Sequence, residues 1–419
     1  MTTLAEQCRA MALRAKAAAR LLNSAGTTAK NAWLTSCAGV VRRAEAELLA
    51  ANAMDIAEAP VYGLSAASID RLTLTPKRIA AMAEGLLQVA ALPDPIGEVR
   101  EGHTRPNGLQ VLKVGVPLGV VFFLYESRPN VTADAAALCV KSGNAVILRG
   151  GKEARYTNAA LHRLLQQELP KFDLPVDAVQ LVATTDRDAV GHFLKMDDCI
   201  DLTIPRGGES LIRRVCAEAT MPVLKHFNGN CHIYVDESAG LEQTVAIVIN
   251  AKCQRPGVCN AVETILLHER WAEQHWPALA TALVDAGVEL RACEASRALY
   301  PQAKPATDED YATEYLDLIL AVKMVSGVQE AMDHIDRFGS KHTDAILTND
   351  VATARRFTQQ VDSAAVVVNA STRFNDGFEL GLGAEIGIST DKFHARGPCG
   401  LKELTTYKYI LTGDGHVRP

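Results

Sequence analysis

The 419-residue sequence lacks an apolar run long enough to cross a membrane. Its longest, residues 114–125, holds twelve residues and includes Pro117, whereas a membrane-spanning helix needs about twenty. The sequence also lacks an excess of positive charge, because its 43 Lys and Arg residues are outnumbered by 49 Asp and Glu residues. Binding to bulk nucleic acid, which needs a strongly basic surface, is therefore not expected. With 48% apolar residues, a chain of this length predicts a globular protein of two or three domains.

Closely spaced cysteine pairs are absent too. The ten cysteines include no CxxC pair, and most lie within apolar stretches, as reduced core thiols do. The nearest approach to a metal cluster is Cys231, His232, Cys253 and Cys259, whose spacing matches no zinc pattern. We therefore expect no metal. Because no signal peptide is recognisable either, the sequence predicts a cytoplasmic protein.

The order of helical and extended segments predicts the fold class. Residues 3–92 are expected to be helical, and residues 99–116 to form a β-hairpin. Two series of apolar strands and helices follow, over residues 119–219 and 232–370. Such strands are typical of parallel sheets covered on both faces, which predicts an α/β protein. Residues 405–411 are expected to add an edge strand.

Glycine turns predict where a nucleotide binds. The usual GxGxxG fingerprint is missing, since residues 381–387 imitate it with the wrong spacing. Two other turns each join a predicted strand to a helix, where glycine and the helix N-terminus can receive a phosphate. Either turn alone could be a matter of backbone geometry, but the pair favours a dinucleotide site. Their residues are Arg149, Gly150, Gly151, Lys152, Pro205, Arg206, Gly207 and Gly208.

Cys259 is the residue that most suggests chemistry. Helix formers stop at Pro256 and Gly257, and an apolar strand resumes at Val262, so Cys259 is expected in a constrained loop. A thiol there can face a cleft and react as a thiolate, although the residue chemistry leaves an inert loop thiol open. Cys253, on the preceding helix, is expected to be structural.

Two other sets of polar residues have competing interpretations. Asn130 opens a predicted helix, where it could be a turn or cap residue or could donate its amide to an oxyanion. Ser340, His342 and Asp344 alternate along one strand and resemble parts of a catalytic triad. Because triad members rarely come from one strand, we do not expect these three to act together.

The Cys259 segment also resembles a known family. Residues 254–264, QRPGVCNAVET, are similar to the nucleophile segment of the gamma-glutamyl phosphate reductases, which belong to the aldehyde dehydrogenase superfamily. The resemblance implies that Cys259 is the nucleophile. Further similar blocks follow in the family's order at residues 126–132, 141–145, 149–154, 205–208, 342–346, 374–377, 382–387 and 394–398.

The resemblance implies an aldehyde-dehydrogenase-like fold in three parts. A Rossmann-type cofactor domain would comprise residues 1–98 and 117–231, and a catalytic domain residues 232–388. Residues 99–116 and 389–419 would form a small β-arm for oligomerisation, so a homo-oligomer is expected.

The resemblance further implies a cofactor and two site residues. Arg149 and Lys152 fall where relatives contact the adenosine ribose, and two cations there suit the 2′-phosphate of NADPH. The two glycine turns would complete the cofactor site. Asn130 falls where the superfamily keeps its oxyanion amide, and Arg255 is expected to contact the leaving phosphate. Arg373, Asp376 and Glu379 are candidates for holding the rest of the substrate.

The implied reaction is the NADPH-dependent reduction of L-glutamate 5-phosphate to L-glutamate 5-semialdehyde, a step of proline biosynthesis, through a thioester on Cys259. Aldehyde-oxidising relatives place a glutamate in a Leu-Glu-Leu-Gly-Gly segment to hydrolyse the thioester, and the corresponding residues 221–235 hold no acid. That absence favours reduction. Functional coupling to glutamate 5-kinase is a further expectation. The alternatives are an aldehyde-oxidising or CoA-acylating dehydrogenase, or a non-catalytic nucleotide-binding protein.

Overall fold

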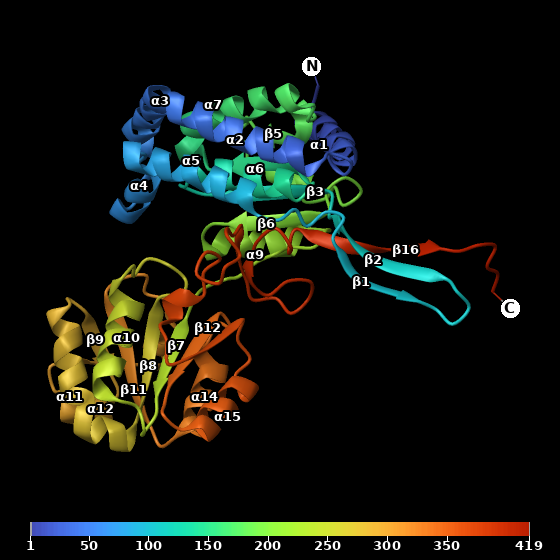
Figure 1. Cartoon of the computed structure of the whole chain (residues 1–419). Helices are drawn as coiled ribbons and strands as arrows, with labels where there is room; N and C mark the ends of the chain where they lie inside the picture. Colours follow the sequence, from blue (N-terminus) through green and yellow to red (C-terminus); the bar gives the residue numbers. More distant parts are fainter. Residues whose placement is uncertain (1, 419) are drawn as a thin grey trace. The chain divides into compact units, whose positions relative to one another are not determined.

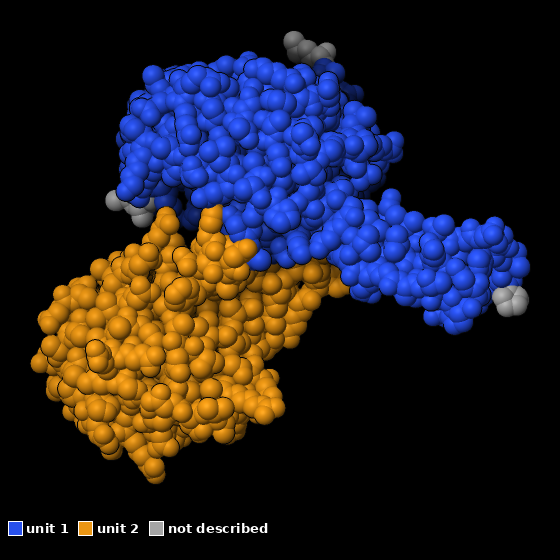
Figure 2. All heavy atoms as spheres, in the orientation of Figure 1, with its two compact units in different colours: residues 1–225, 382–387, 399–419 blue, residues 226–381, 388–398 orange. Residues whose placement is uncertain are grey.

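The computed structural model describes residues 2–418, without the side chains of residues 66 and 67. The chain forms two compact units (Figure 2). Unit 1 comprises residues 1–225, 382–387 and 399–419, and unit 2 comprises residues 226–381 and 388–398. Strands β14 (Gly387–Ser389) and β15 (Gly397–Cys399) pair with each other where the chain returns from unit 2 to unit 1.

Unit 1 contains a four-stranded parallel sheet with the order β5-β4-β3-β6. Every residue of β3 is buried, as expected of a strand covered on both faces. The chain builds the sheet outward from β3 to β5 and then returns to place β6 on the other side of β3. Ligands of open parallel sheets bind at such a reversal, outside the carboxyl ends. The strands are β3 (Val120–Tyr125), β4 (Ala145–Gly150), β5 (Val179–Leu181) and β6 (Leu202–Arg206).

Local signals start the helices of unit 1. Thr3 and Glu6 form a reciprocal capping box on the first helix, and Pro76 opens the fifth after its N-cap Thr75. The predicted helical character of residues 3–92 is confirmed. The helices are α1 (Leu4–Leu22), α2 (Thr27–Arg43), α3 (Glu45–Glu58), α4 (Ala66–Leu72), α5 (Pro76–Ala91), α6 (Asn130–Lys141), α7 (Arg155–Glu168), α8 (Asp188–Phe193) and α9 (Glu209–Glu218).

A three-stranded antiparallel sheet projects from unit 1 (Figures 1 and 2). The predicted hairpin forms it together with the predicted tail strand, which pairs along the whole of β2. At the turn, the N–H of Arg105 donates to Leu109 O at 2.8 Å, and Gly108 adopts a left-handed φ of 92°. We call this sheet the arm; its strands are β1 (Val99–Thr104), β2 (Gln110–Pro117) and β16 (Thr405–Thr412).

Unit 2 is built on a seven-stranded parallel sheet with the order β10-β9-β11-β8-β7-β12-β13. Its strands are β7 (Cys231–Val235), β8 (Val262–His268), β9 (Glu289–Ala292), β10 (Lys304–Pro305), β11 (Ile319–Val325), β12 (Thr343–Leu347) and β13 (Ala365–Val368). Two of them, β9 and β10, were not predicted, because both are short and because buried and partly exposed residues alternate along β9. Its helices are α10 (Leu241–Cys253), α11 (Glu269–Asp285), α12 (Glu294–Leu299), α13 (Asp308–Ala312), α14 (Val328–Phe338) and α15 (Val351–Gln360).

Alternate residues of the central strands feed two separate cores of unit 2. Ile233 and Ile265 pack in a cluster that contains the tryptophans of α11. Tyr234 and Leu266, one residue further along, pack with residues of α14 and with Phe357 of α15. Helices therefore cover both faces of the sheet (Figure 1), as the apolar strands predicted. Among the residues described, no helix combines the length and the apolar character needed to span a membrane.

Candidate active site

Three segments that are distant in sequence meet at the amino edge of the unit 2 sheet. Strands β8, β7 and β12 are parallel neighbours, so their amino ends lie side by side. Cys259 lies shortly before β8, His342 directly before β12, and His226 in the segment leading to β7. The Cys259 Sγ and one ring nitrogen of each histidine lie within 4.8 Å of one another. This cluster, His226–Cys259–His342, is the centre of the candidate site.

The backbone of Cys259 is held from the β7 side. A Cβ added to Gly229 would stand 1.9 Å from Cys259 O and 2.5 Å from Cys259 Cα, so only glycine fits there. The Cys231 thiol donates to Cys259 O at 3.1 Å. Burial raises the pKa of Cys231 far above its ordinary value, which keeps that thiol protonated as a donor. Cys259 itself is partly exposed, as a nucleophile must be.

The two imidazoles give the thiol proton acceptors. His342 is fully buried, and its Nδ1 lies 2.8 Å from the hydroxyl of Thr343, which in turn accepts from Asn375 Nδ2 at 2.7 Å. The half-buried His226 packs against the His342 ring with centroids 5.6 Å apart and planes at 66°. A neutral imidazole beside a cysteine can take its proton and activate it as a nucleophile.

Sequence reasoning missed the role of His342. As expected, it does not act in a triad with Asp344, whose carboxylate instead accepts from the backbone N–H of His232 at 3.0 Å and lies 3.1 Å from the Nδ1 of that residue. What the sequence did not reveal is that the start of β12 lies next to the Cys259 loop. The available signal was the position of His342 at the start of a predicted strand, but the order of strands in the sheet could not be predicted.

Arginines and carboxylates gather near the Cys259 loop. Arg373 donates from Nε to Gln254 Oε1 at 2.9 Å and also binds Asn260 Oδ1, so its guanidinium is fixed beside the Cys259 loop. Burial lowers the pKa of Arg373, the nearby Arg255 lowers it further, and Cys259 raises it. Asp376 and Glu379 also raise it, so Arg255 and Arg373 can contact an anionic substrate but stand beside two carboxylates.

The Glu314 carboxylate contacts the segment of residues 221–235, which itself contains no acidic residue. Glu314, from the loop after α13, accepts the N–H of Gly229 through Oε1 at 2.8 Å. That bond engages the carboxylate in holding the loop around Cys259. Glu314 is therefore a positioning group that the local sequence pattern could not reveal.

Asn130 is the first residue of α6, at the carboxyl end of β3 in unit 1. It is exposed, and its Nδ2 donates to Asp134 Oδ2 at 2.8 Å, one helical turn on. Burial raises the pKa of Asp134 to about 6. An amide nitrogen carries two hydrogens, so this contact orients Asn130 and leaves a second N–H that can donate to an oxyanion.

The first glycine turn follows β4, beside the reversal of the unit 1 sheet. A Cβ on Gly150 would lie 2.1 Å from Asn158 Nδ2, and one on Gly151 would lie 2.1 Å from Glu153 Oε1. Burial lowers the pKa of the half-buried Arg149, while Lys152 is exposed and stands over the ring of Tyr62 at 4.7 Å. The turn thus combines two glycines with two cations, which suit a phosphate, and the Glu153 carboxylate already lies against Gly151.

The second glycine turn differs from its expectation. The N–H of Gly208, at the start of α9, donates to Glu126 Oε2 at 2.8 Å. A Cβ on Gly207 would stand 2.4 Å from the same oxygen. Glu126 is brought there because its own N–H bonds Arg206 O at 3.1 Å across the ends of β3 and β6. This helix N-terminus therefore already binds a carboxylate, which a phosphate would have to displace.

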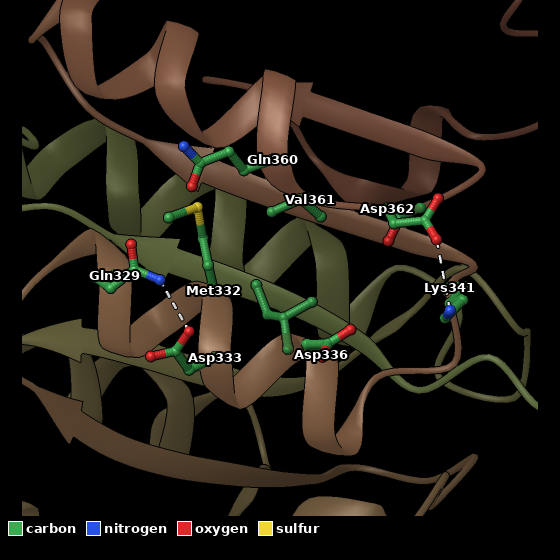
Figure 3. Close-up of a pocket in the computed structure, with 10 residues that line it drawn as sticks. Gln329, Met332, Asp333, Asp336, Lys341, Gln360, Val361 and Asp362 are labelled. Carbon is green, nitrogen blue, oxygen red and sulfur yellow. Dashed lines mark hydrogen bonds and ion pairs between the residues drawn. The ribbon is translucent and has the colours of Figure 1, made fainter.

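A pocket of about 200 Å³ in unit 2 is lined by none of the three residues of the His226–Cys259–His342 cluster (Figure 3). Its lining includes Asp333, Asp336 and Asp362, and Lys341 lies 3.4 Å from Asp362. Gln329 donates to Asp333 at 2.9 Å. This lining contains no cysteine or histidine, so it does not repeat the combination of a thiol with imidazoles found around Cys259.

Comparison with known proteins agrees with the fold. The model of the aldehyde dehydrogenase family matches residues 2–294. The chain belongs to the aldehyde dehydrogenase family.

More specific relatives match the whole chain. It is 59% identical to gamma-glutamyl phosphate reductase of Rhodopirellula baltica, over 99% of this chain and 96% of that one. It is 55% identical to the protein of the same name from Moorella thermoacetica, over 97% of each chain. The crystal structure of gamma-glutamyl phosphate reductase from Thermotoga maritima superposes with a TM-score of 0.96 at 44% identity, over 98% of this chain and 100% of that one. The resemblance seen around Cys259 and the aldehyde-dehydrogenase-like fold are thereby confirmed.

Proposed function

We propose that this protein reduces L-glutamate 5-phosphate to L-glutamate 5-semialdehyde and phosphate, a step of proline biosynthesis, with Cys259 as the nucleophile. The observation that carries the proposal is the Cys259 thiol within 4.8 Å of two imidazoles, in a chain 59% identical to a gamma-glutamyl phosphate reductase. The cations Arg255 and Arg373 beside the thiol suit a substrate that carries both a phosphate and a carboxylate.

The first half of the reaction forms a thioester. An imidazole of His226 or His342 takes the proton of the Cys259 thiol, and the thiolate attacks the acyl carbon. The C–S bond forms, the bond from carbon to the phosphate oxygen breaks, and the imidazolium returns its proton to the departing phosphate. The Asn130 amide and the Cys259 backbone N–H hold the oxyanion in between, and one such donor is worth about 3 kcal/mol.

The second half reduces the thioester. NADPH, when held by unit 1, would supply the hydride that the thioester carbon needs. The C–S bond then breaks, the aldehyde leaves, and the thiolate is regenerated. Residues 149–152 and 205–208 hold the cofactor, and Arg149 and Lys152 favour NADPH over NADH by pairing with its 2′-phosphate. In the second turn, the Gly208 N–H already donates to the Glu126 carboxylate. We assign the phosphate contacts to the first turn because it carries Arg149 and Lys152.

The test is the reverse reaction of the purified protein with NADP⁺ and glutamate 5-semialdehyde. Reduction of NADP⁺ is expected only when phosphate is present. C259A should abolish it while NADP⁺ still binds, and C253A, which removes a half-exposed thiol on α10, should leave it intact. Activity of C259A above a few per cent would contradict the covalent scheme. Dependence on CoA or on water in place of phosphate would instead indicate an acylating or an oxidising dehydrogenase.

The arm suits assembly with a second copy of the chain. Tyr407, Tyr409 and Leu411 follow one another on one face of β16 and are 45%, 57% and 60% exposed. Burying that apolar face would stabilise a homo-oligomer. All ten cysteines are free thiols, the state that the cytoplasm maintains, and we place the protein there. Functional coupling to glutamate 5-kinase would protect the labile acyl phosphate from water.

A further inference from the structure

We propose that His226, Cys259 and His342 form a binding site for a soft divalent cation such as Zn²⁺, and that the bound cation reversibly blocks the nucleophile. The inhibitory part of this inference rests on the proposed function, whereas the binding site does not. Within the residues described, these three are the group of potential metal ligands found close enough together to hold an ion.

The ligand set matches the chemistry of zinc. A thiolate and two imidazoles are ligands that favour Zn²⁺ over Mg²⁺ or Ca²⁺, which prefer oxygen. Three protein ligands with an open fourth position are the arrangement of catalytic zinc sites, with Zn–S at about 2.3 Å and Zn–N at about 2.0–2.1 Å. Ligand atoms in such a tetrahedron lie about 3.5 Å apart, so the present 4.8 Å limit requires a contraction of about an ångström.

The surroundings permit that contraction. His342 is fixed, since it is fully buried and its Nδ1 lies 2.8 Å from Thr343 Oγ1. A hydrogen bond at the ring nitrogen that does not bind the metal orients a ligating histidine. The side chains of His226 and Cys259 are only partly buried, so they can rotate toward the fixed imidazole while the Cys259 backbone stays in place.

Binding would stop the thiol reaction for a simple reason. The thiolate lone pair that attacks the acyl carbon is the one that would be donated to the metal. Both imidazoles would be occupied as well, which removes the proton acceptors. Cation release restores all three groups, so the block is reversible by a chelator and involves no change of oxidation state.

The test uses Co²⁺ as a spectroscopic probe of the purified protein, without substrate. Wild type is expected to bind one Co²⁺ with a thiolate-to-cobalt charge-transfer band, which Zn²⁺ displaces and excess Mg²⁺ does not. The band should be lost in C259S and weakened in H226N. It should persist in C253S, because Cys253 is not part of the cluster. H342N provides a further loss-of-binding variant if it folds.

A second readout follows alkylation of Cys259 by iodoacetamide. Zn²⁺ should slow it at least about tenfold, and EDTA should restore the original rate. No band in wild type, or a band that survives in C259S, would overturn the inference. A protein that shows the band but has no phosphate-dependent activity would support the metal site and contradict the proposed function. An active protein without the band would support the proposed function and contradict the metal site.

Discussion

Gly229 lies so close to Cys259 that a single Cβ on the glycine would stand 1.9 Å from the cysteine's carbonyl oxygen. The contact is between backbones, and neither residue has a flexible end that can move aside. The position of the nucleophile is therefore set by a residue 30 positions away that takes no part in the chemistry.

The first prediction concerns this contact. G229A should push the Cys259 loop away and lower kcat by roughly 10²-fold, because a displacement of about 1 Å from reacting geometry costs that much. The measurement is steady-state kinetics together with the rate of iodoacetamide labelling at Cys259. G240A, at a position where a Cβ meets nothing within 4 Å, is the control. An unchanged kcat in G229A would show that the loop is not held in this way.

The second prediction concerns the imidazoles. H226N should lower kcat at least about tenfold, since a positioned general base contributes roughly 10²–10⁴ and His342 remains to compensate in part. H226N/H342N should lose more than either single variant. The pH profile of Cys259 alkylation separates a proton acceptor from a packing residue, because only the former shifts the profile. Identical profiles in wild type and both variants would remove histidines from the mechanism.

The third prediction concerns cofactor choice. K152A should weaken NADPH about tenfold or more and leave NADH nearly unchanged, since a charge-assisted contact with phosphate is worth about 1.5–3 kcal/mol. Dissociation constants from the quenching of nicotinamide fluorescence would measure it. K77A removes an exposed lysine of α5 and should bind both cofactors as wild type does. Equal losses for NADPH and NADH in K152A would argue against a 2′-phosphate contact.

The fourth prediction concerns a buried ion pair of unit 2. Lys252 Nζ lies 2.6 Å from Glu263 Oε2, and both side chains are fully buried. Burial raises the pKa of Glu263 to about 7, and Lys252 lowers it. K252M removes the stabilising cation and should reduce the free energy of unfolding by about 3–5 kcal/mol at high pH.

The sign of the pH effect follows from that pKa. A carboxyl whose pKa is raised by folding favours the folded state below its unfolded value, and this contribution is lost as the pH rises through the folded value. In wild type this loss ends near pH 7, whereas without Lys252 the pKa of Glu263 should be higher and the loss should continue, so the deficit of K252M should grow as the pH rises through 7. Urea unfolding followed by tryptophan fluorescence would measure it, since Trp271 and Trp276 lie in the same unit. K252M/E263L should recover most of the loss, and a double variant as unstable as K252M would contradict this account.

The fifth prediction concerns the arm. L411K places a charge on the exposed apolar face of β16 and should shift the protein to a smaller oligomer in size-exclusion chromatography with light scattering. V417E changes a residue that is 84% exposed and lies beyond β16, and it should keep the wild-type mass. If L411K keeps that mass too, the arm is not an interface.

Much of this protein follows from local pattern. The helical N-terminal region, the hairpin turn at residues 105–108 and the buried parallel strands are dictated by helix formers, turn residues and continuous apolar runs, each of which acts within a few residues. The loop position of Cys259 was predicted for the same reason, because Pro256 and Gly257 end a helix before an apolar strand begins. The motif around Cys259 then identified the family.

Tertiary structure decided what lies beside that thiol. His226 and His342 reach Cys259 because β7, β8 and β12 are neighbours, and the order of strands in a parallel sheet depends on contacts between segments a hundred residues apart. The cap of Glu126 on Gly208, the pairing of Lys252 with Glu263 and the approach of Glu314 to Gly229 arise in the same way. Hydrogen bonds and ion pairs of this kind form only once the sheets have brought their partners within about 3 Å. The spacing of residues along the chain therefore does not predict them.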